Sequence, residues 1–406
     1  MLKLSYRQTK RSWSRYQEEG DRGLVHRARG KPSNRQSEQE TKERALLLYR
    51  EQYSDYGPTL AAECLSKEDS LEVKVTTLRR WLVVAGLWER KRKRRKHRLR
   101  RARRSHFGEL VQLDGSHHDW FESRRLVGQS ASQREIPYAG WAVLMVMIDD
   151  ATGRVFARFY ENESWHSAAD VFTEYVARYG LPRGLYVDQA AIYRVDREPT
   201  SEEILTDKQP ETQYGRAMRE LDVELILARS AQAKGRVERM NSTLQDRLVK
   251  AMRRAKVSDL GAANKFLDEE FLPDLNARFT VTSAKSEDWH RGLDASLELS
   301  RVLSVQETRV VQNDWTIRWH NRLLQLPAES ASVVEPSQSV TLCEQLDGTL
   351  RVFLGDVELS WSEASRDPSR SKPKSPRKGP TGSSQGHKPR VDHPWRKPFE
   401  EPTHAT

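Results

Sequence analysis

The chain has 406 residues, which is enough for more than one domain and for a sizeable buried core. Its 69 Lys and Arg residues outnumber its 58 Asp and Glu residues, and the net charge of +11 favours a polyanionic partner. The chain has two cysteines, Cys64 and Cys343, which are far apart in the sequence and argue against a disulfide scaffold or a structural zinc site. No apolar run is long enough to span a membrane. We therefore expect a soluble protein of the reducing cytosol.

The first predicted element is a basic helix over residues 6–16, capped by Ser5 and closed by Gly20. Its cations could bind DNA phosphates and Gln8 could hydrogen-bond to a base edge, as in the recognition helix of a helix-turn-helix. The alternative is a basic helix on the protein surface. A support helix does not precede it, so a truncated or misassigned start is one interpretation of this end.

Three further helices are predicted after a polar linker. They cover residues 38–53, 60–67 (capped by Thr59) and 75–82. The last of them carries the adjacent cations Arg79 and Arg80. This order is typical of a helix-turn-helix or winged-helix module, and we favour DNA binding over a plain helical bundle.

A dense run of cations follows from residue 90 to residue 104 and includes Arg92, Arg94 and Arg95. Such a run cannot pack into a core. We expect it to follow a phosphate backbone, with steep salt dependence and little sequence preference, rather than to be only a solvated linker.

The next segment predicts the first half of an α/β domain. A strand-like run over residues 107–115 ends at Asp114, and residues 141–148 form a continuous apolar strand suited to burial on both faces. Residues 149–153 predict a hairpin turn before a returning strand, so we interpret Asp149 and Asp150 as turn residues rather than metal ligands. An amphipathic helix over residues 167–179 follows.

The second half alternates strands and helices. Asp188 lies at the tip of a short strand that begins at residue 184, and a charged insertion spans residues 195–209. A helix over 213–221, a strand over 223–227 and a helix over 231–250 complete the domain. Three strands in a meander followed by this alternation predict a ribonuclease H-like fold.

Short polar and apolar alternations over residues 307–326 and 333–359 predict a small antiparallel β-barrel. From residue 362 the chain is rich in Pro, Ser, Gly and Lys, and we expect a disordered basic tail.

The helix over 231–250 presents a carboxylate among polar groups. Val237, Met240, Leu244 and Leu248 form its apolar stripe, and Glu238 lies on a neighbouring face. On its own this would be a solvated helix face. Two strand-end carboxylates and one helix carboxylate, however, are the arrangement needed to hold two Mg²⁺ ions for in-line phosphoryl transfer.

The blocks VQLDGSHHDWFE, LYVDQAAIY and AQAKGRVERMNSTLQDRL together resemble the Asp-Asp-Glu integrase core of bacterial insertion-sequence transposases, with the ISNCY group nearest. The resemblance covers residues 36 to 330 and implies Asp114, Asp188 and Glu238 as the catalytic, metal-binding triad. The family usually has a Ser before its second Asp, where this chain has Val187.

The resemblance implies a DNA transposase that binds terminal inverted repeats and catalyses strand cleavage and strand transfer with two Mg²⁺ (or Mn²⁺) ions. Its partners would be double-stranded DNA at the transposon ends and the target, and further copies of the chain in a synaptic complex, in a bacterial, nucleoid-associated cytoplasmic setting. One alternative is a catalytically silent DNA-binding regulator derived from a transposase, and another is a ribonuclease H acting on RNA–DNA hybrids.

Further residues are expected around this site. His117 and His118 are candidates for substrate contact, and the DNA-facing cations are Lys234, Arg236 and Arg239. The predicted organisation is a partial helix-turn-helix and linker (1–36), a helix-turn-helix or winged-helix module (37–89), a basic linker (90–105), the integrase catalytic core (106–303), the β-barrel (304–361) and the tail (362–406).

Overall fold

The protein is described by a computed structural model that covers residues 4–26, 29, 39–89, 102–122, 124, 140–205, 209–228 and 235–364. Contacts divide the chain into two compact units. One comprises Met1–Arg103, His118–Trp141 and Glu238–Phe271, and the other comprises Arg104–His117, Ala142–Val237 and Leu272–Thr406. Several predicted features lie outside the described residues: Arg92, Arg94, Arg95, Lys234 and the tail from residue 365 onward.

The N-terminal helix α1 (Tyr6–Glu19) begins at a capping box and ends at Gly20. Gln8 N donates to Ser5 Oγ at 3.3 Å, and Ser5 N donates to the Gln8 side chain at 3.0 Å, which pairs two N–H groups that a helix start otherwise leaves open. Gly20 has a φ of 63° and leads into the 3₁₀ turn η1 (Gly20–Leu24). The predicted helix is confirmed, and its recognition role stays a prediction.

Three helices form a bundle with its own core: α2 (Gln39–Gln52), α3 (Pro58–Lys67) and α4 (Val75–Val84). Ala45, Leu65, Leu78 and Leu82 are fully buried between them. The helix α3 begins at Pro58, one residue before the predicted cap Thr59, because proline's fixed φ suits the first helical position.

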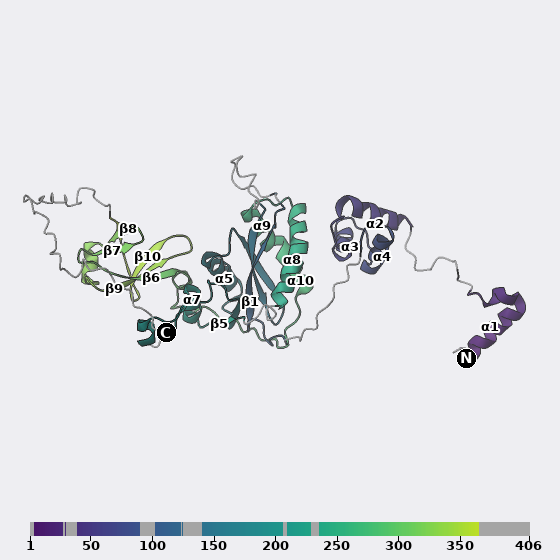
Figure 1. The fold of residues 1–406 in the computed structure, drawn as a ribbon, viewed down its shortest axis with the longest axis horizontal. Coiled ribbons are helices and arrows are strands. Elements are labelled where there is room, and N and C mark those ends of the chain that lie inside the picture. Colours follow the sequence, from purple (N-terminus) through teal and green to yellow (C-terminus); the bar gives the residue numbers. More distant parts are fainter. Residues whose placement is uncertain are drawn as a thin grey trace, which may run out of the picture. The chain divides into compact units, whose positions relative to one another are not determined.

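A five-stranded sheet forms the centre of the α/β region, in the order β3-β2-β1-β4-β5. The pairs β1–β4 and β4–β5 are parallel, and β2–β3 is an antiparallel hairpin, which is the predicted ribonuclease H-like arrangement (Figure 1). The strands are β1 (Val111–His118), β2 (Ala142–Asp149), β3 (Val155–Tyr160), β4 (Gly184–Val187) and β5 (Glu224–Leu227). As expected, β2 is buried along its whole length.

Helices α5 (Trp165–Tyr179) and α7 (Gln213–Glu220) pack against one face of this sheet (Figure 1). Val111, Leu113 and Met145 of the sheet share a core with Phe172 of α5 and Met218 of α7. The charged insertion contains one short helix, α6 (Ser201–Leu205). None of the described helices has the length and apolar character required to cross a bilayer.

The long helix α8 (Gly235–Arg254) buries Val237, Leu244 and Leu248, which confirms the predicted apolar stripe. Its second half contacts the bundle, because Arg247 forms an ion pair with Glu63 of α3 and Arg253 forms one with Asp55 in the turn between α2 and α3. The remaining helical elements are α9 (Leu260–Phe266), the π-helical turn η4 (Leu267–Phe271), α10 (Leu272–Phe279) and α11 (Leu299–Val302).

The C-terminal strands form two antiparallel sheets rather than the predicted barrel within the described part of the chain. One has the order β11-β10-β9-β6 and the other β12-β8-β7. Ile317, Leu324, Val340 and Val352 share one apolar core, so the two sheets pack face to face and do not close on each other. The elements are β6 (Val305–Val310), β7 (Thr316–Trp319), β8 (Arg322–Gln325), the turn η5 (Ala328–Ser332), β9 (Ser339–Glu344), β10 (Leu350–Leu354), β11 (Val357–Leu359) and β12 (Ser362–Glu363).

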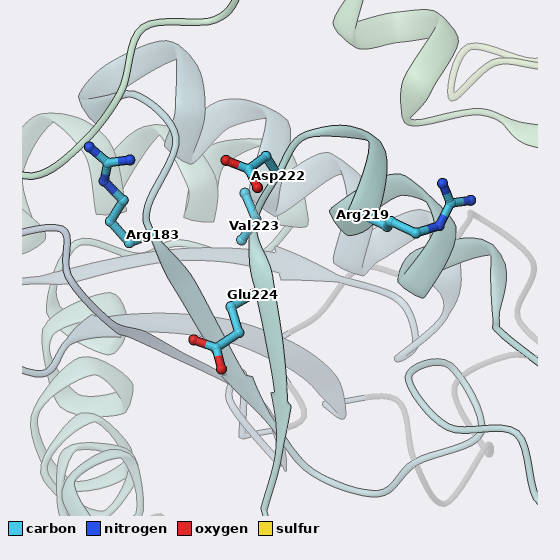
Figure 2. Close-up of a pocket in the computed structure, with 5 residues that line it drawn as sticks. All are labelled: Arg183, Arg219, Asp222, Val223 and Glu224. Carbon is cyan, nitrogen blue, oxygen red and sulfur yellow. The ribbon is translucent and has the colours of Figure 1, made fainter. Parts of the chain in front are cut away.

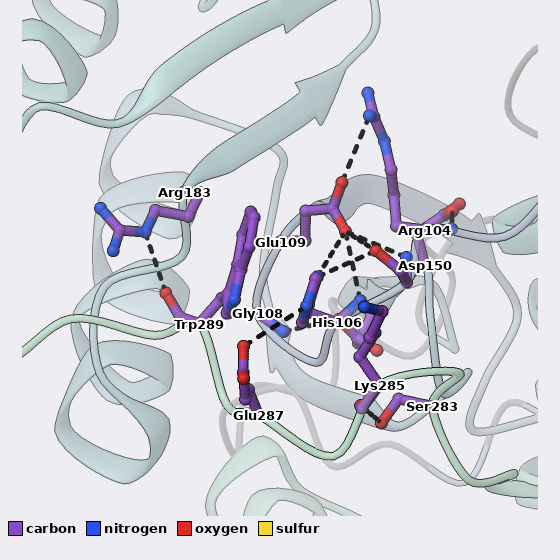
Figure 3. A network of polar contacts seen from close by, with 12 residues as sticks. Arg104, His106, Gly108, Glu109, Asp150, Arg183, Ser283, Lys285, Glu287 and Trp289 are labelled. Atoms are coloured by element: carbon purple, nitrogen blue, oxygen red, sulfur yellow. Dashed lines mark hydrogen bonds and ion pairs between the residues drawn. The ribbon is translucent and has the colours of Figure 1, made fainter.

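The turn between β2 and β3 is confirmed, and its two carboxylates, Asp149 and Asp150, are buried. Asp150 accepts a hydrogen bond from Arg104 N at 2.9 Å (Figure 3). It also accepts one from Gln112 Nε2 at 2.8 Å and pairs with the Arg236 guanidinium. Asp149 Oδ1 accepts from Thr152 N at 2.7 Å, and burial raises the pKa of Asp149. These carboxylates therefore join the turn to β1 and to the residues that precede it.

Removing the Asp150 carboxylate should destabilise this sheet strongly. In Asp150→Ala, the half-buried Arg236 loses its counter-charge and Gln112 loses its acceptor. We expect native-state hydrogen exchange of the β2 amides to report a loss of about 3–5 kcal/mol. The matched variant Asp356→Ala removes a carboxylate whose partner Arg301 lies on the surface, and it should leave these amides unchanged. Equal exchange in both variants would contradict the structural role of Asp150.

Candidate active site

Asp114 and Asp188 lie opposite each other on neighbouring strands. In the parallel pairing of β1 with β4, Gln112 lies opposite Tyr186, and two further steps along both chains bring Asp114 opposite Asp188. Neighbouring strands are about 4.8 Å apart, and residues in register point to the same face. The two half-buried carboxylates therefore lie close together where β4 ends, as predicted.

The strand that carries Asp114 differs from the prediction. β1 does not end at Asp114 but continues to His118, because β1 also pairs with β2 on its other side. Asp188 directly follows the last residue of β4, as expected. Asp188 Oδ1 accepts a hydrogen bond from Ala190 N at 2.9 Å, which fixes the orientation of its carboxylate in a tight turn.

A further carboxylate, Glu163, lies at this edge and was not predicted. It precedes Ser164, the N-cap of α5, and a Cβ atom added at Gly115 would come within 2.5 Å of Glu163 Oε2. The absence of a side chain at Gly115 thus makes room for the Glu163 carboxylate on the face of β1 opposite to that of Asp114. The only hint in the sequence was the Asp114-Gly115 pair, and it does not identify which distant residue fills the space.

Tyr193 is the second unpredicted residue at this edge. Its side chain is 5% exposed, and its hydroxyl has no hydrogen-bond partner among the described residues. Burial, followed by the nearby charges of Tyr214, Glu163, Asp188 and Asp114, raises the pKa of the Tyr193 phenol well above its usual value.

The predicted third ligand, Glu238, is exposed in the first turn of α8 and belongs to the other compact unit. The structure brings Asp114 and Asp188 together, and the role of Glu238 as a third ligand stays a prediction. Among the residues it describes, no three His, Cys, Asp or Glu side chains are arranged to hold a metal ion. The Asp114–Asp188 pair nevertheless supplies hard oxygen donors of the kind that Mg²⁺ prefers.

The two histidines after Asp114 have different surroundings. His117 is more than half exposed, and its Nε2 lies 3.0 Å from Glu163 Oε2. His118 packs edge-on against the buried Trp120 ring, at a centroid distance of 5.2 Å. His117 is therefore placed where a ligand could reach it, and contact between either histidine and a substrate stays a prediction.

The predicted DNA-facing cations also differ. Arg79, Arg80 and Arg239 are exposed, and the Arg79 guanidinium lies 5.9 Å from the Trp88 ring centroid. Arg236 is instead half-buried against Asp150. Arg79 and Arg80 are thus exposed cations of the bundle, and Arg236 has a structural partner.

A shallow pocket of about 320 Å³ lies at the opposite edge of the sheet, where β4 and β5 begin (Figure 2). Its cations have partners: Arg183 Nε donates to Trp289 O at 3.1 Å, and Arg219 pairs with Glu211 at 2.8 Å. This pocket is separate from the Asp114–Asp188 edge.

Among solved structures, the chain is similar to an intasome of simian T-cell lymphotropic virus in complex with PP2A regulatory subunit B56 gamma, with a TM-score of 0.32, 13% identity, and coverage of 79% of this chain and 98% of that chain. It is also similar to the catalytic core domain of BIV integrase, with a TM-score of 0.24, 19% identity, and coverage of 40% and 86%. No known protein-family profile matches the chain.

The family of the chain is shown by its similarity in sequence to two transposases. The chain is 27% identical over 400 residues to the transposase for insertion sequence IS1202 of Streptococcus pneumoniae, covering 89% of this chain and 79% of the relative. It is 39% identical over 328 residues to the y4bF protein of Sinorhizobium fredii, which is named as a transposase, covering 80% of this chain and 67% of the relative. The chain therefore belongs to the transposase family that includes y4bF.

Proposed function

We propose that the chain is a DDE-type transposase of the ISNCY group, which binds the terminal inverted repeats of its element and cuts and joins DNA strands there. The observation that carries the proposal is the in-register placement of Asp114 and Asp188 at one sheet edge, in a chain of the transposase family. Two acidic side chains fixed by a sheet can hold a cation against a phosphodiester without rearranging during the reaction.

Asp114 and Asp188, together with Glu238, are proposed to hold two Mg²⁺ or Mn²⁺ ions. When bound, such ions supply charge stabilisation for the attacking and leaving oxygens of an in-line displacement. The protein's contribution is positional: β1 fixes Asp114, and the hydrogen bond from Ala190 N fixes Asp188. The exposed imidazole of His117, held by Glu163, is placed to contact a nearby phosphate.

Double-stranded DNA, at the element's ends and at the target, is the proposed partner. The net charge of +11 supports this choice, and Arg79 and Arg80 offer exposed cations on α4. We further propose that copies of the chain assemble on paired ends in a synaptic complex. The residues of the basic linker and Lys234 would add phosphate contacts.

Loss of either sheet carboxylate should abolish the chemistry. We expect Asp114→Asn and Asp188→Asn each to lower Mg²⁺-dependent strand transfer on a terminal-repeat duplex by more than about 100-fold, because each removes a charge proposed to bind the ion. Asp196→Asn is the matched control, since that carboxylate is exposed and forms an ion pair with Arg194 at 2.8 Å. Undiminished transfer in Asp114→Asn, with DNA binding intact, would exclude the proposed mechanism, whereas DNA binding without any strand transfer by the wild type would favour the silent regulator.

The exposed cations of α4 should contribute affinity through phosphates. We expect Arg79→Ala and Arg80→Ala to weaken binding to any duplex and each to reduce the slope of log affinity against log salt by about 1. Fluorescence anisotropy at several salt concentrations measures this slope. Arg50→Ala, at an exposed position of α2, is the control. A slope that changes equally in Arg50→Ala would show a general charge effect and refute a DNA-facing role for α4.

A further inference from the structure

The outer side of α4 carries two exposed valines that the folding of the bundle does not use. Leu78, Trp81 and Leu82 of this helix point inward and are buried in the core of the bundle. In the last turn of α4, by contrast, Val83 is 49% exposed and Val84 is 78% exposed. Valine is also a weaker helix former than alanine or leucine, so neither packing nor helix propensity explains why valines occupy these positions.

The exposed residues of α4 form one continuous surface. Thr76, Arg80 and Val83 recur at intervals of four and three residues, so their side chains follow one line along the helix. Arg79 and Val84 lie on either side of this line and are also exposed. The α4 outer face, as we name these five residues, belongs to a helix of 10 residues that is about 15 Å long.

The charge of the α4 outer face selects the class of partner. The helix α4 contains no acidic residue, whereas α2 contains Glu40, Glu43 and Glu51 and α3 contains Glu63. Two copies of the α4 outer face would bring like charges together, which makes self-association through this face unfavourable. A phosphate backbone is instead attracted to its two arginines, so the partner with matching charge is a nucleic acid.

The valines narrow the choice to one groove of duplex DNA. The major groove of B-DNA is wide enough for an α-helix, and the apolar group that a base edge presents there is the C5 methyl of thymine. A valine side chain has no hydrogen-bonding atom, so it gains from a base edge by removing such a methyl from water. Arginines beside the valines reach the phosphates that border the groove.

We propose that the α4 outer face enters the major groove, where Val83 and Val84 contact thymine methyl groups and Arg79 and Arg80 contact the flanking phosphates. The inference rests on the proposed function and assigns part of its sequence preference to two residues. Contacts to phosphates give affinity without sequence preference, whereas contacts to base edges specify the sequence. The arginines and the valines are therefore distinguished by different measurements.

Replacement of thymine by uracil tests the valines, because it removes the C5 methyl and nothing else. The full chain first selects a preferred duplex from a library of random sequences, without a divalent cation. Single thymines of that duplex are then replaced by uracil, and fluorescence anisotropy gives the affinity. For the wild type we expect at least one replacement to weaken binding about 4-fold, the effect of one buried methyl group.

In the double variant Val83→Ser/Val84→Ser, this uracil penalty should disappear. The slope of log affinity against log salt should remain that of the wild type, because no phosphate contact is removed. Serine and valine have similar helix propensities, and both side chains are exposed, so circular dichroism should show an unchanged fold. Leu47→Ser is the matched control, since Leu47 is 53% exposed on α2 of the same bundle. It should keep the wild-type uracil penalty.

The outcomes separate this inference from the proposed function. If the wild type selects a duplex but the valine variant retains the uracil penalty, DNA binding stands and the role of the valines is refuted. The absence of any uracil penalty in the wild type, or an equal loss of it in Leu47→Ser, refutes that role as well. If the wild type selects no duplex, recognition of specific DNA ends and the role of the valines are both overturned.

Discussion

The parallel pairing of β1 with β4 is the constraint on which the candidate site depends. Two aspartates that are far apart in the sequence become neighbours only because Gln112 lies opposite Tyr186, so that the next in-phase residues on both strands are acidic. A shift of one residue in this register would turn one carboxylate to the opposite face of the sheet. The apolar residues that alternate with them, Leu113 and Val187, are fully buried and make such a shift unfavourable.

The buried turn at Asp150 supports the same strand from the other end. Gln112, two residues before Asp114, donates a hydrogen bond to the Asp150 carboxylate. The same carboxylate accepts a hydrogen bond from the backbone N–H of Arg104 and forms an ion pair with Arg236 of α8. Beside it, the His106 ring stacks on Trp289 at 3.9 Å, and the Glu109 carboxylate accepts from Ser105 N (Figure 3). The strand that carries Asp114 is thus anchored by polar groups that are nearly all paired, which suits a site that must hold charge in a fixed place.

Local patterns in the sequence predict the elements well, and they predict less about tertiary pairings. The apolar run of β2, the Ser5 cap and the stripe of Val237, Leu244 and Leu248 all depend on neighbouring residues, so the helices and strands could be derived. The placement of Asp114 beside Asp188 followed from two strand-like runs ending in carboxylates and from the resemblance to integrase cores.

The remaining features arise from contacts between distant segments. Glu163 precedes an ordinary helix cap, and only its packing against Gly115 reveals its proximity to Asp114. Alternation predicted strands over the C-terminal region but could not specify which strands pair, so two facing sheets replaced the expected barrel. The turn at Asp150 could be predicted but its burial could not, because its partners, Gln112 and Arg236, come from elsewhere in the chain.

The contacts of α8 with the helical bundle have a mechanical consequence. Glu238 lies near the start of this helix, whereas Arg247, nine residues later, is paired with Glu63 of α3. An α-helix rises 1.5 Å per residue and resists bending, so about 14 Å of rigid helix joins Glu238 to Arg247. A displacement of α3 therefore also moves the backbone of Glu238, so the position of the bundle and the position of the Glu238 carboxylate are coupled through α8.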